Sequence, residues 1–238
     1  MVGDSIAMTS RAETVSPVRK TSRSIEERLA TVPRPVPVMS RQEAAALTSR
    51  QREILADLTA LISNGFSHLT MADLAGQLGC SLRTLYGIAA SRDLLVLLAC
   101  DRNLWGAGRE AREAVGPQIE LRPLAGLRRY LRAATRAVSA TTAAFSADLS
   151  AIPGGQELND AHTQYLVAIT KELLDMAVEQ GEIEPVSTLV VAHAMAGIST
   201  VFIRPEVIDT LPGSPKQASD QVVDIILGGL TAPRTEST

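Results

Sequence analysis

The sequence predicts an all-α fold, and three observations support this prediction. Apolar residues make up 45% of the 238 residues, whereas aromatic residues make up 3%. Alanine and leucine, which favour helices, occur throughout, and runs of β-branched residues are few. Beyond residue 48, apolar residues recur at helical spacing in most segments. A chain of this length can bury a sizeable core, and we expect no sheet.

The N-terminal segment, residues 1–40, is expected to be a flexible arm. It shows no sustained apolar periodicity, and a short helix is expected only at residues 24–30. The arm ends in a stretch whose prolines prevent a helix, namely Pro33, Pro35 and Pro37.

Four helices are predicted in the next part of the chain. The first, residues 49–64, is apolar on one face and ends at Gly65. The second follows an approximate capping box of Thr70 and Asp73, and is barely two turns long. Ser81 can cap a third short helix, and a fourth begins at residue 91 with an apolar run over residues 94–99.

Longer helices are predicted beyond residue 105. They cover residues 123–140, 158–180, 185–202 and about 215–230, with breaks at 150–155 and around 211–214. The helix over residues 185–202 is apolar on nearly every side, so it must be covered on two sides. It mixes larger apolar residues with the small residues Ala192, Ala194, Ala196, Gly197 and Ser199. We therefore expect it to pair with the last helix in a four-helix interface between two copies of the chain, although a buried central helix would show the same pattern.

Two short helices joined by a glycine-containing turn, with a third helix behind them, form the helix-turn-helix arrangement that reads the major groove of DNA. The string ILADLTALISNGFSHLTMADLAGQLGCSLRTLYGIAASRDLLVLL, residues 54–98, resembles the N-terminal domain of TetR-family transcriptional regulators, without an insertion. The resemblance implies a three-helix DNA-binding domain at residues 41–95 and a larger helical ligand-binding and dimerisation domain at 96–238. It also implies a homodimeric repressor that a small, largely apolar ligand releases from double-stranded operator DNA.

The resemblance also implies roles for individual residues. It places Thr70 and Tyr86 on DNA phosphates and Ser81 at the start of the recognition helix. Arg83 and Thr84 fall within reach of base edges, and Arg92 matches a position where the family usually has a lysine that points at the DNA backbone. Other interpretations remain open, because Thr70 and Ser81 would cap helices in any helical protein, Tyr86 could be a core residue, and both arginines could be solvated.

The sequence departs from the family pattern at two positions. Ala89 stands where the family usually has an aromatic residue, and Leu82 where a polar or basic residue is common. The arm adds a further possibility, since its basic residues either solubilise a tail or reach a minor groove. These residues are Arg19, Lys20 and Arg23.

Ligand contacts are predicted where polar or aromatic residues interrupt apolar stretches of the C-terminal part. His162, Tyr165 and His193 could orient a bound molecule. The walls of this site would come from Trp105, Phe145 and Met176. Each of these six residues could instead be an ordinary core or surface residue.

Charge and composition limit the classes of function. The net charge of −3 is uneven, because residues 1–39 carry six basic and four acidic residues, whereas residues 105–238 carry eleven basic and sixteen acidic ones. An anionic partner should therefore meet the N-terminal part. Cys80 and Cys100 indicate a reducing, cytoplasmic protein, and no apolar run is long enough to span a membrane.

Two other classes of function compete with a DNA-binding regulator. The first is an enzyme, but the sequence contains no hydrolase, metalloprotease, dinucleotide or P-loop motif and no Cys/His cluster, so we expect neither catalysis, a cofactor nor a metal. The second is a helical ligand-binding or adaptor protein that derives from such a repressor and no longer binds DNA.

Overall fold

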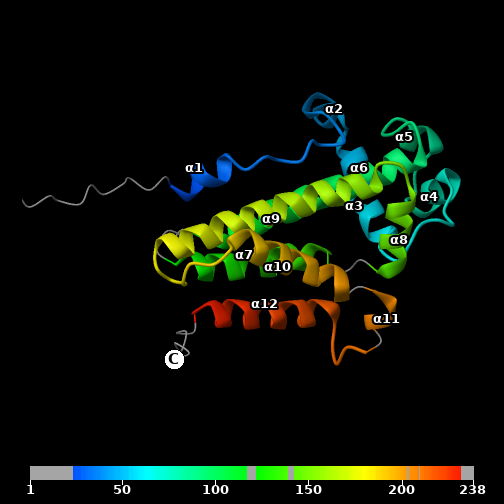
Figure 1. Cartoon of the computed structure of the whole chain (residues 1–238). Coiled ribbons are helices and arrows are strands. Elements are labelled where there is room, and N and C mark those ends of the chain that lie inside the picture. The colour runs from blue at the N-terminus through cyan, green and yellow to red at the C-terminus, as the bar shows by residue number, and fades with distance from the viewer. Residues whose placement is uncertain (1–23, 117–121, 139–141, 203, 209, 232–238) are drawn as a thin grey trace, which may run out of the picture.

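A computed structural model describes residues 24–116, 122–138, 142–202, 204–208 and 210–231 (Figure 1). These residues form helices and contain no strand, as predicted. The helices are α1 (Ile25–Ala30), α2 (Arg41–Ala46), α3 (Ser49–Leu61), α4 (Met71–Gln77), α5 (Leu82–Tyr86), α6 (Arg92–Val115), α7 (Pro123–Val138), α8 (Ala143–Ala151), α9 (Gly155–Glu179), α10 (Thr188–Phe202), α11 (Pro205–Ile208) and α12 (Pro215–Thr231).

Two hydrophobic cores hold these helices together, and α6 contributes to both. Its first half, including Leu95 and Leu98, packs with α3, α4 and α5. Its second half, including Ala111 and Val115, packs with α7, α9, α10 and α12. A single continuous helix therefore connects the small N-terminal bundle to the larger C-terminal one.

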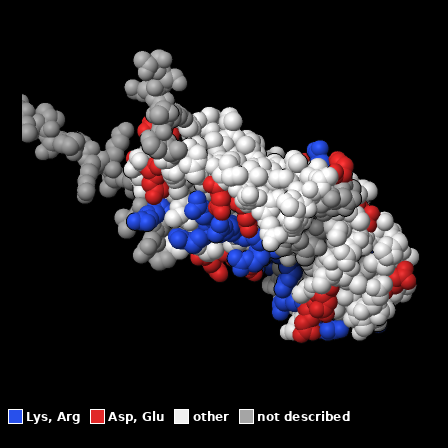
Figure 2. All heavy atoms as spheres, turned by 90° about the horizontal axis from the view of Figure 1, so that it is seen from below, with Lys and Arg blue, Asp and Glu red and all other residues white. Residues whose placement is uncertain are grey.

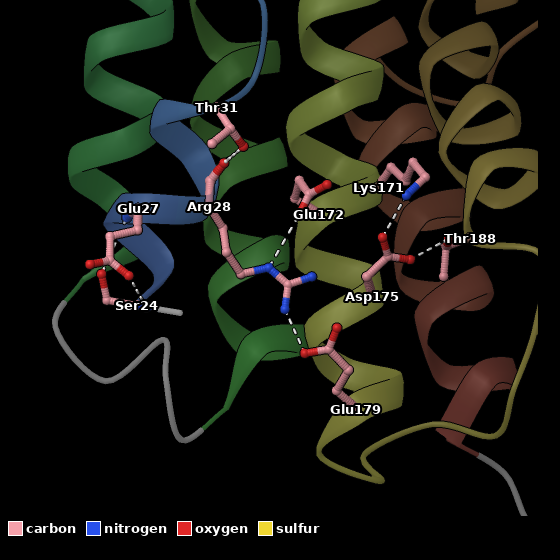
Figure 3. A network of polar contacts seen from close by, with 9 residues as sticks. All are labelled: Ser24, Glu27, Arg28, Thr31, Lys171, Glu172, Asp175, Glu179 and Thr188. Atoms are coloured by element: carbon pink, nitrogen blue, oxygen red, sulfur yellow. Dashed lines mark hydrogen bonds and ion pairs between the residues drawn. The ribbon is translucent and has the colours of Figure 1, made fainter. Parts of the chain in front are cut away.

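Residues 24–40, which precede α2, lie along the body of the protein (Figure 1). Ser24 caps α1, and the buried side chains of Ile25 and Leu29 join the C-terminal core. Arg28 forms ion pairs with Glu172 at 3.1 Å and Glu179 at 2.5 Å, both on α9 (Figure 3). The predicted short helix is thus present, and contacts with α9 hold it at the end of the molecule far from α4 and α5 (Figure 1). The basic residues Arg19, Lys20 and Arg23 lie outside the described residues.

Several predicted elements occur close to their expected bounds, but three helices were missed. The break around residues 150–155 separates α8 from α9, and α10 and α12 occupy the predicted segments. The prediction did not include the six-residue α2, the four-residue α11, or α8, which packs with the N-terminal core through Phe145 and Leu149.

The outer face of α10 is largely apolar and exposed, and α12 adds exposed Ile225 beside the polar residue Gln221. Ala192, Met195 and Ala196 point into the core, whereas the opposite side of α10 carries exposed side chains. The exposed large apolar residues on the two helices are Leu189, Val190, Val201 and Ile225. The side of the molecule where α12 lies has a broad area without charged side chains, next to a band in which Lys and Arg are interspersed with Asp and Glu (Figure 2). None of the described helices is both long and apolar enough to span a lipid bilayer.

Candidate nucleic-acid interface and ligand cavity

The turn between α4 and α5 has the geometry that a helix-turn-helix needs. Gly79 adopts a left-handed conformation with φ of 59°, and the Cys80 N–H donates to the Ala75 carbonyl at 2.9 Å. These features end α4 sharply, because a residue with a side chain would be strained at this φ. Ser81 then accepts from the Thr84 N–H at 3.1 Å, so α5 begins shortly after Gly79.

The short helix α5 has one buried and one exposed face. Leu85 is fully buried, and Ile88 and Ala89 continue the contact with the core behind it. The opposite face carries Leu82, exposed Arg83 and Tyr86, whose exposed fraction is 55%. Tyr86 is therefore not a core residue. Ala89 fills the position of the expected aromatic residue and is itself buried.

Thr70 and Ser81 both serve as helix caps. The Thr70 hydroxyl donates to Asp73 at 2.6 Å and accepts from the Asp73 N–H, in a full capping box. Hydrogen bonds from the Thr70 hydroxyl and N–H hold the pKa of Asp73 below its ordinary value. The Ser81 and Thr84 hydroxyls are hydrogen-bonded to each other at 2.8 Å. Capping is thus a role that these residues already have without DNA, and their phosphate contacts stay a prediction.

Arg92 ties the start of α6 to the loop between α3 and α4. Its guanidinium donates to the Ser67 and Leu69 carbonyls, each at 3.2 Å, and is paired with Asp93 at 2.9 Å. This structural role was not predicted, because the carbonyls lie more than 20 residues earlier in the chain. A phosphate contact by Arg92 would compete with these bonds.

A cavity of about 270 Å³ lies between the two bundles. Its walls come from α3, α6, α7, α8, α9, α10 and α12 and are mostly apolar. Phe145, His162 and Tyr165 line this cavity, so the structure brings together three of the six residues predicted for a ligand site.

The other three predicted ligand residues lie elsewhere. Trp105 packs behind the wall, with its ring centroid 5.4 Å from that of His162 and 6.1 Å from that of Tyr165. Met176 is buried in the core of the C-terminal bundle, and His193 is exposed on the outer side of α10. Tyr130 lines the cavity but was not predicted. Its position three residues after Leu127, on the inward face of α7, was the signal that could have found it.

A buried carboxylate connects the cavity wall to the segment that precedes α2. Asp101 of α6 is hydrogen-bonded to the His162 Nε2 atom at 3.0 Å and accepts from the Val38 N–H at 3.0 Å. The exposed fractions of the two side chains are 7% for Asp101 and 10% for His162. A group that binds His162 from the cavity would therefore also affect Asp101, which holds the backbone at Val38.

The helix α8 connects the cavity to the loop between α3 and α4. Asp148 of α8 accepts from the Phe66 N–H at 2.5 Å and the Ser67 N–H at 2.7 Å. Phe145, one turn earlier, lines the cavity and meets the ring of Phe66 edge-on at 5.9 Å. One short helix thus contacts both the cavity and the bundle that contains α4 and α5.

We expect Asp148→Asn to lower stability in a pH-dependent way. Burial acts to raise the pKa of Asp148, but the Phe66 and Ser67 N–H groups outweigh it and hold the pKa below its ordinary value. The ionised carboxylate therefore stabilises the folded state above the unfolded pKa of about 3.9, and this contribution is lost as the pH falls through the lowered folded value.

Urea unfolding at pH 7 should show Asp148→Asn to be less stable than the parent chain by about 1 kcal/mol. The difference should shrink as the pH falls below about 4. Asp57→Asn, on the exposed side of α3, is the control and should leave stability unchanged at both pH values. A difference for Asp148→Asn that does not vary with pH would contradict the assigned role.

Within the described residues, no group of three or more His, Cys, Asp or Glu side chains could hold a metal ion. Burial raises the pKa of the Cys100 thiol to about 12. This thiol is therefore protonated at neutral pH and is not poised as a nucleophile or metal ligand.

Comparison with solved structures identifies the fold. A TetR family transcriptional regulator, PfmR from Thermus thermophilus, matches with a TM-score of 0.55 and 23% identity, over 74% of this chain and 98% of that chain. A transcriptional regulator from Cytophaga hutchinsonii matches with a TM-score of 0.59 and 14% identity, over 76% and 96%. The regulator AibR, solved in complex with isovaleryl coenzyme A and operator DNA, matches with a TM-score of 0.53 and 19% identity, over 74% and 97%.

The chain therefore has the fold of TetR-family transcriptional regulators, with an N-terminal helix-turn-helix bundle and a larger helical bundle after it. No protein-family model matches the sequence, and the comparison with curated proteins finds no significant match.

Proposed function

We propose that this protein is a transcriptional regulator that binds operator DNA through α5 and acts as a repressor until a small, largely apolar ligand enters the cavity. The observation that carries the proposal is the exposed face of α5, held outward by the buried Leu85 on its other side. Arg83 and Tyr86 on this face are the residue types that contact base edges and phosphates. AibR, which has the same fold, was solved in complex with operator DNA.

The DNA-binding unit is proposed to be a homodimer. A single short helix contacts few bases, and paired helix-turn-helix units bind half-sites about 34 Å or its multiples apart. The exposed apolar side chains of α10 and α12 favour pairing with a second copy, because burying them in a four-helix interface removes them from water.

Ligand release is proposed to act through α6 and α8. Both helices line the cavity and contact the bundle that carries α5, so a shift of either helix moves one recognition helix relative to that of the second subunit. Thermodynamic linkage then requires operator DNA to weaken ligand binding by the same factor as ligand weakens DNA binding.

The experiment that tests the proposal is selection of bound sequences from a random DNA pool with the full chain, at low and at physiological salt. We expect a palindromic site, since a two-fold symmetric dimer presents two identical recognition helices. Loss of all DNA affinity even at low salt would instead identify a helical ligand-binding or adaptor protein. Exposed Leu82 and the balanced charge of residues 40–104, six basic and six acidic, would fit that outcome.

We expect Arg83→Ala and Tyr86→Phe to weaken binding to the selected site in different ways. Arg83→Ala should cost about 1–3 kcal/mol and relax specificity at one base pair, because a base contact is lost. Tyr86→Phe should weaken all sequences alike, because a phosphate contact carries no sequence information. Gel-shift titration on the selected site and on single-base variants distinguishes the two effects, and unchanged binding by both variants would remove α5 from the interface.

A further inference from the structure

Two buried tyrosines from neighbouring helices line the cavity. Tyr130 of α7 has an exposed fraction of 2%, and Tyr165 of α9 one of 8%. Neither hydroxyl forms a hydrogen bond with any residue in the described part of the chain. Because both residues line the cavity, a bound molecule or water can supply the missing hydrogen-bond partner.

Both hydroxyls are suited to donate a hydrogen bond. Burial raises the pKa of Tyr130, and the neighbouring Tyr165 raises it further, so this phenol stays protonated at neutral pH. A ligand group that pairs with these hydroxyls as donors must be a hydrogen-bond acceptor.

The charges around the cavity limit which molecule can bring that oxygen. Among the described residues, no aspartate or glutamate lines the cavity, so a cation would find no counter-charge. Lys216 lines it, but its ammonium group is already paired with Asp220 of the same helix. A buried charge without a partner is costly, so a neutral ligand is favoured. The apolar walls include Leu104, Leu131, Leu166, Met195 and Val223.

We propose that the cavity takes a neutral, apolar carbonyl compound, such as a ketone or ester, whose oxygen accepts hydrogen bonds from Tyr130 and Tyr165. This inference rests on the proposed function only in taking the cavity as the effector site. It specifies a neutral acceptor group on the ligand and the two side chains that recognise it.

The only tryptophan in the chain provides a direct readout of binding. Trp105 lies against Tyr165 and His162, both of which line the cavity. Titration of the full chain with methyl heptyl ketone, without DNA, should therefore change the tryptophan fluorescence in a saturable manner. Nonanoate and nonylamine, which have a similar chain and carry a charge, serve as matched probes and should bind at least about tenfold more weakly.

Conservative variants test the two hydroxyls. Tyr130→Phe and Tyr165→Phe keep the ring but remove the donor, and each should weaken ketone binding by about three- to tenfold. Thermal unfolding of both ligand-free variants should match that of the parent chain, because neither hydroxyl has a protein partner to lose. Tyr86→Phe is the matched control. It removes the hydroxyl of the third tyrosine, which lies on α5, and should leave ketone affinity unchanged.

The outcomes separate this inference from the proposed function. Ketone binding that depends on Tyr130 and Tyr165 supports the inference even if the random DNA pool yields no site. Three results would each overturn the inference. The ketone could bind no more tightly than nonylamine or nonanoate, both substitutions could leave ketone affinity unchanged, or the ketone could fail to bind at millimolar concentration. A DNA site found in the selection would still support the proposed function in that case.

Discussion

Val190→Arg is expected to convert the proposed dimer into a monomer and to weaken binding to a two-half-site operator by about 10²–10⁴-fold. Val190 has an exposed fraction of 65% on the outer side of α10, a helix that packs against α12. An arginine there would place a charge without a partner in the proposed interface, and two-fold symmetry would place two of them in each dimer. The loss of DNA affinity follows because a monomer contacts one half-site at a time.

Sedimentation velocity would measure the state of association, and gel shift on the selected site would measure DNA affinity. Val36→Arg is the matched control, because Val36 is 87% exposed on the segment between α1 and α2 and lies outside α10 and α12. The control should match the parent chain both in its state of association and in its DNA affinity. A Val190→Arg protein that sediments as a dimer would place the interface on another surface.

For α10, the sequence pattern predicted the apolar character of the helix but not its orientation. The lack of a polar face on residues 185–202 indicated correctly that α10 has two apolar sides. It did not indicate which small residue lies on which side. Ala192 and Ala196 are buried in the core, whereas Ala194 and Gly197 lie on the exposed side. The orientation depends on the contacts of α10 with α9 and α12, which are formed by residues far apart in sequence.

Local signals in the N-terminal bundle predicted more of its structure. Thr70, Ser81 and Ser91 cap α4, α5 and α6 as expected, because a cap requires only residues within the same turn. The role of Arg92 as a link to Ser67 and Leu69 required the fold, and no local pattern indicates it.

The residues that line the cavity were likewise predicted only in part. Phe145, His162 and Tyr165 could be chosen because polar or aromatic residues stand out in apolar stretches. The same criterion also selected Trp105 and His193, which do not line the cavity, since it cannot tell which side of a helix faces a cavity. The helix α8 was missed because the small residues of its sequence AAFSADLSA show no clear apolar stripe.

The second large effect is expected from Gly155→Ala, at the sharp turn between α8 and α9. A Cβ atom at this position would lie 1.8 Å from the Leu149 carbonyl oxygen and 3.2 Å from the Ile152 side chain. The first contact involves backbone, so rotation of a side chain cannot relieve it. We therefore expect a loss of about 3 kcal/mol or more in the free energy of unfolding.

Gly106→Ala is the matched control, because Gly106 lies inside α6 and the nearest atom to its added Cβ would be an Arg109 nitrogen at 3.9 Å. Alanine favours a helix interior over glycine, so this variant should gain about 0.5–1 kcal/mol. Urea unfolding of the parent chain and both variants measures the two effects. Equal stability of Gly155→Ala and the parent would show that the turn can open without cost.

The same substitution tests whether α8 transmits ligand binding. To accommodate the Cβ atom, the C-terminal end of α8 must move, and this helix carries both Asp148, which holds the loop at Phe66 and Ser67, and Phe145, which lines the cavity. If folded Gly155→Ala protein remains at low temperature, the factor by which ligand weakens DNA binding should fall toward one, whereas Gly106→Ala should keep the parent value. A Gly155→Ala protein that retains the full factor would assign the coupling to the other helices that line the cavity and pack in the N-terminal core, among them α6 and α3.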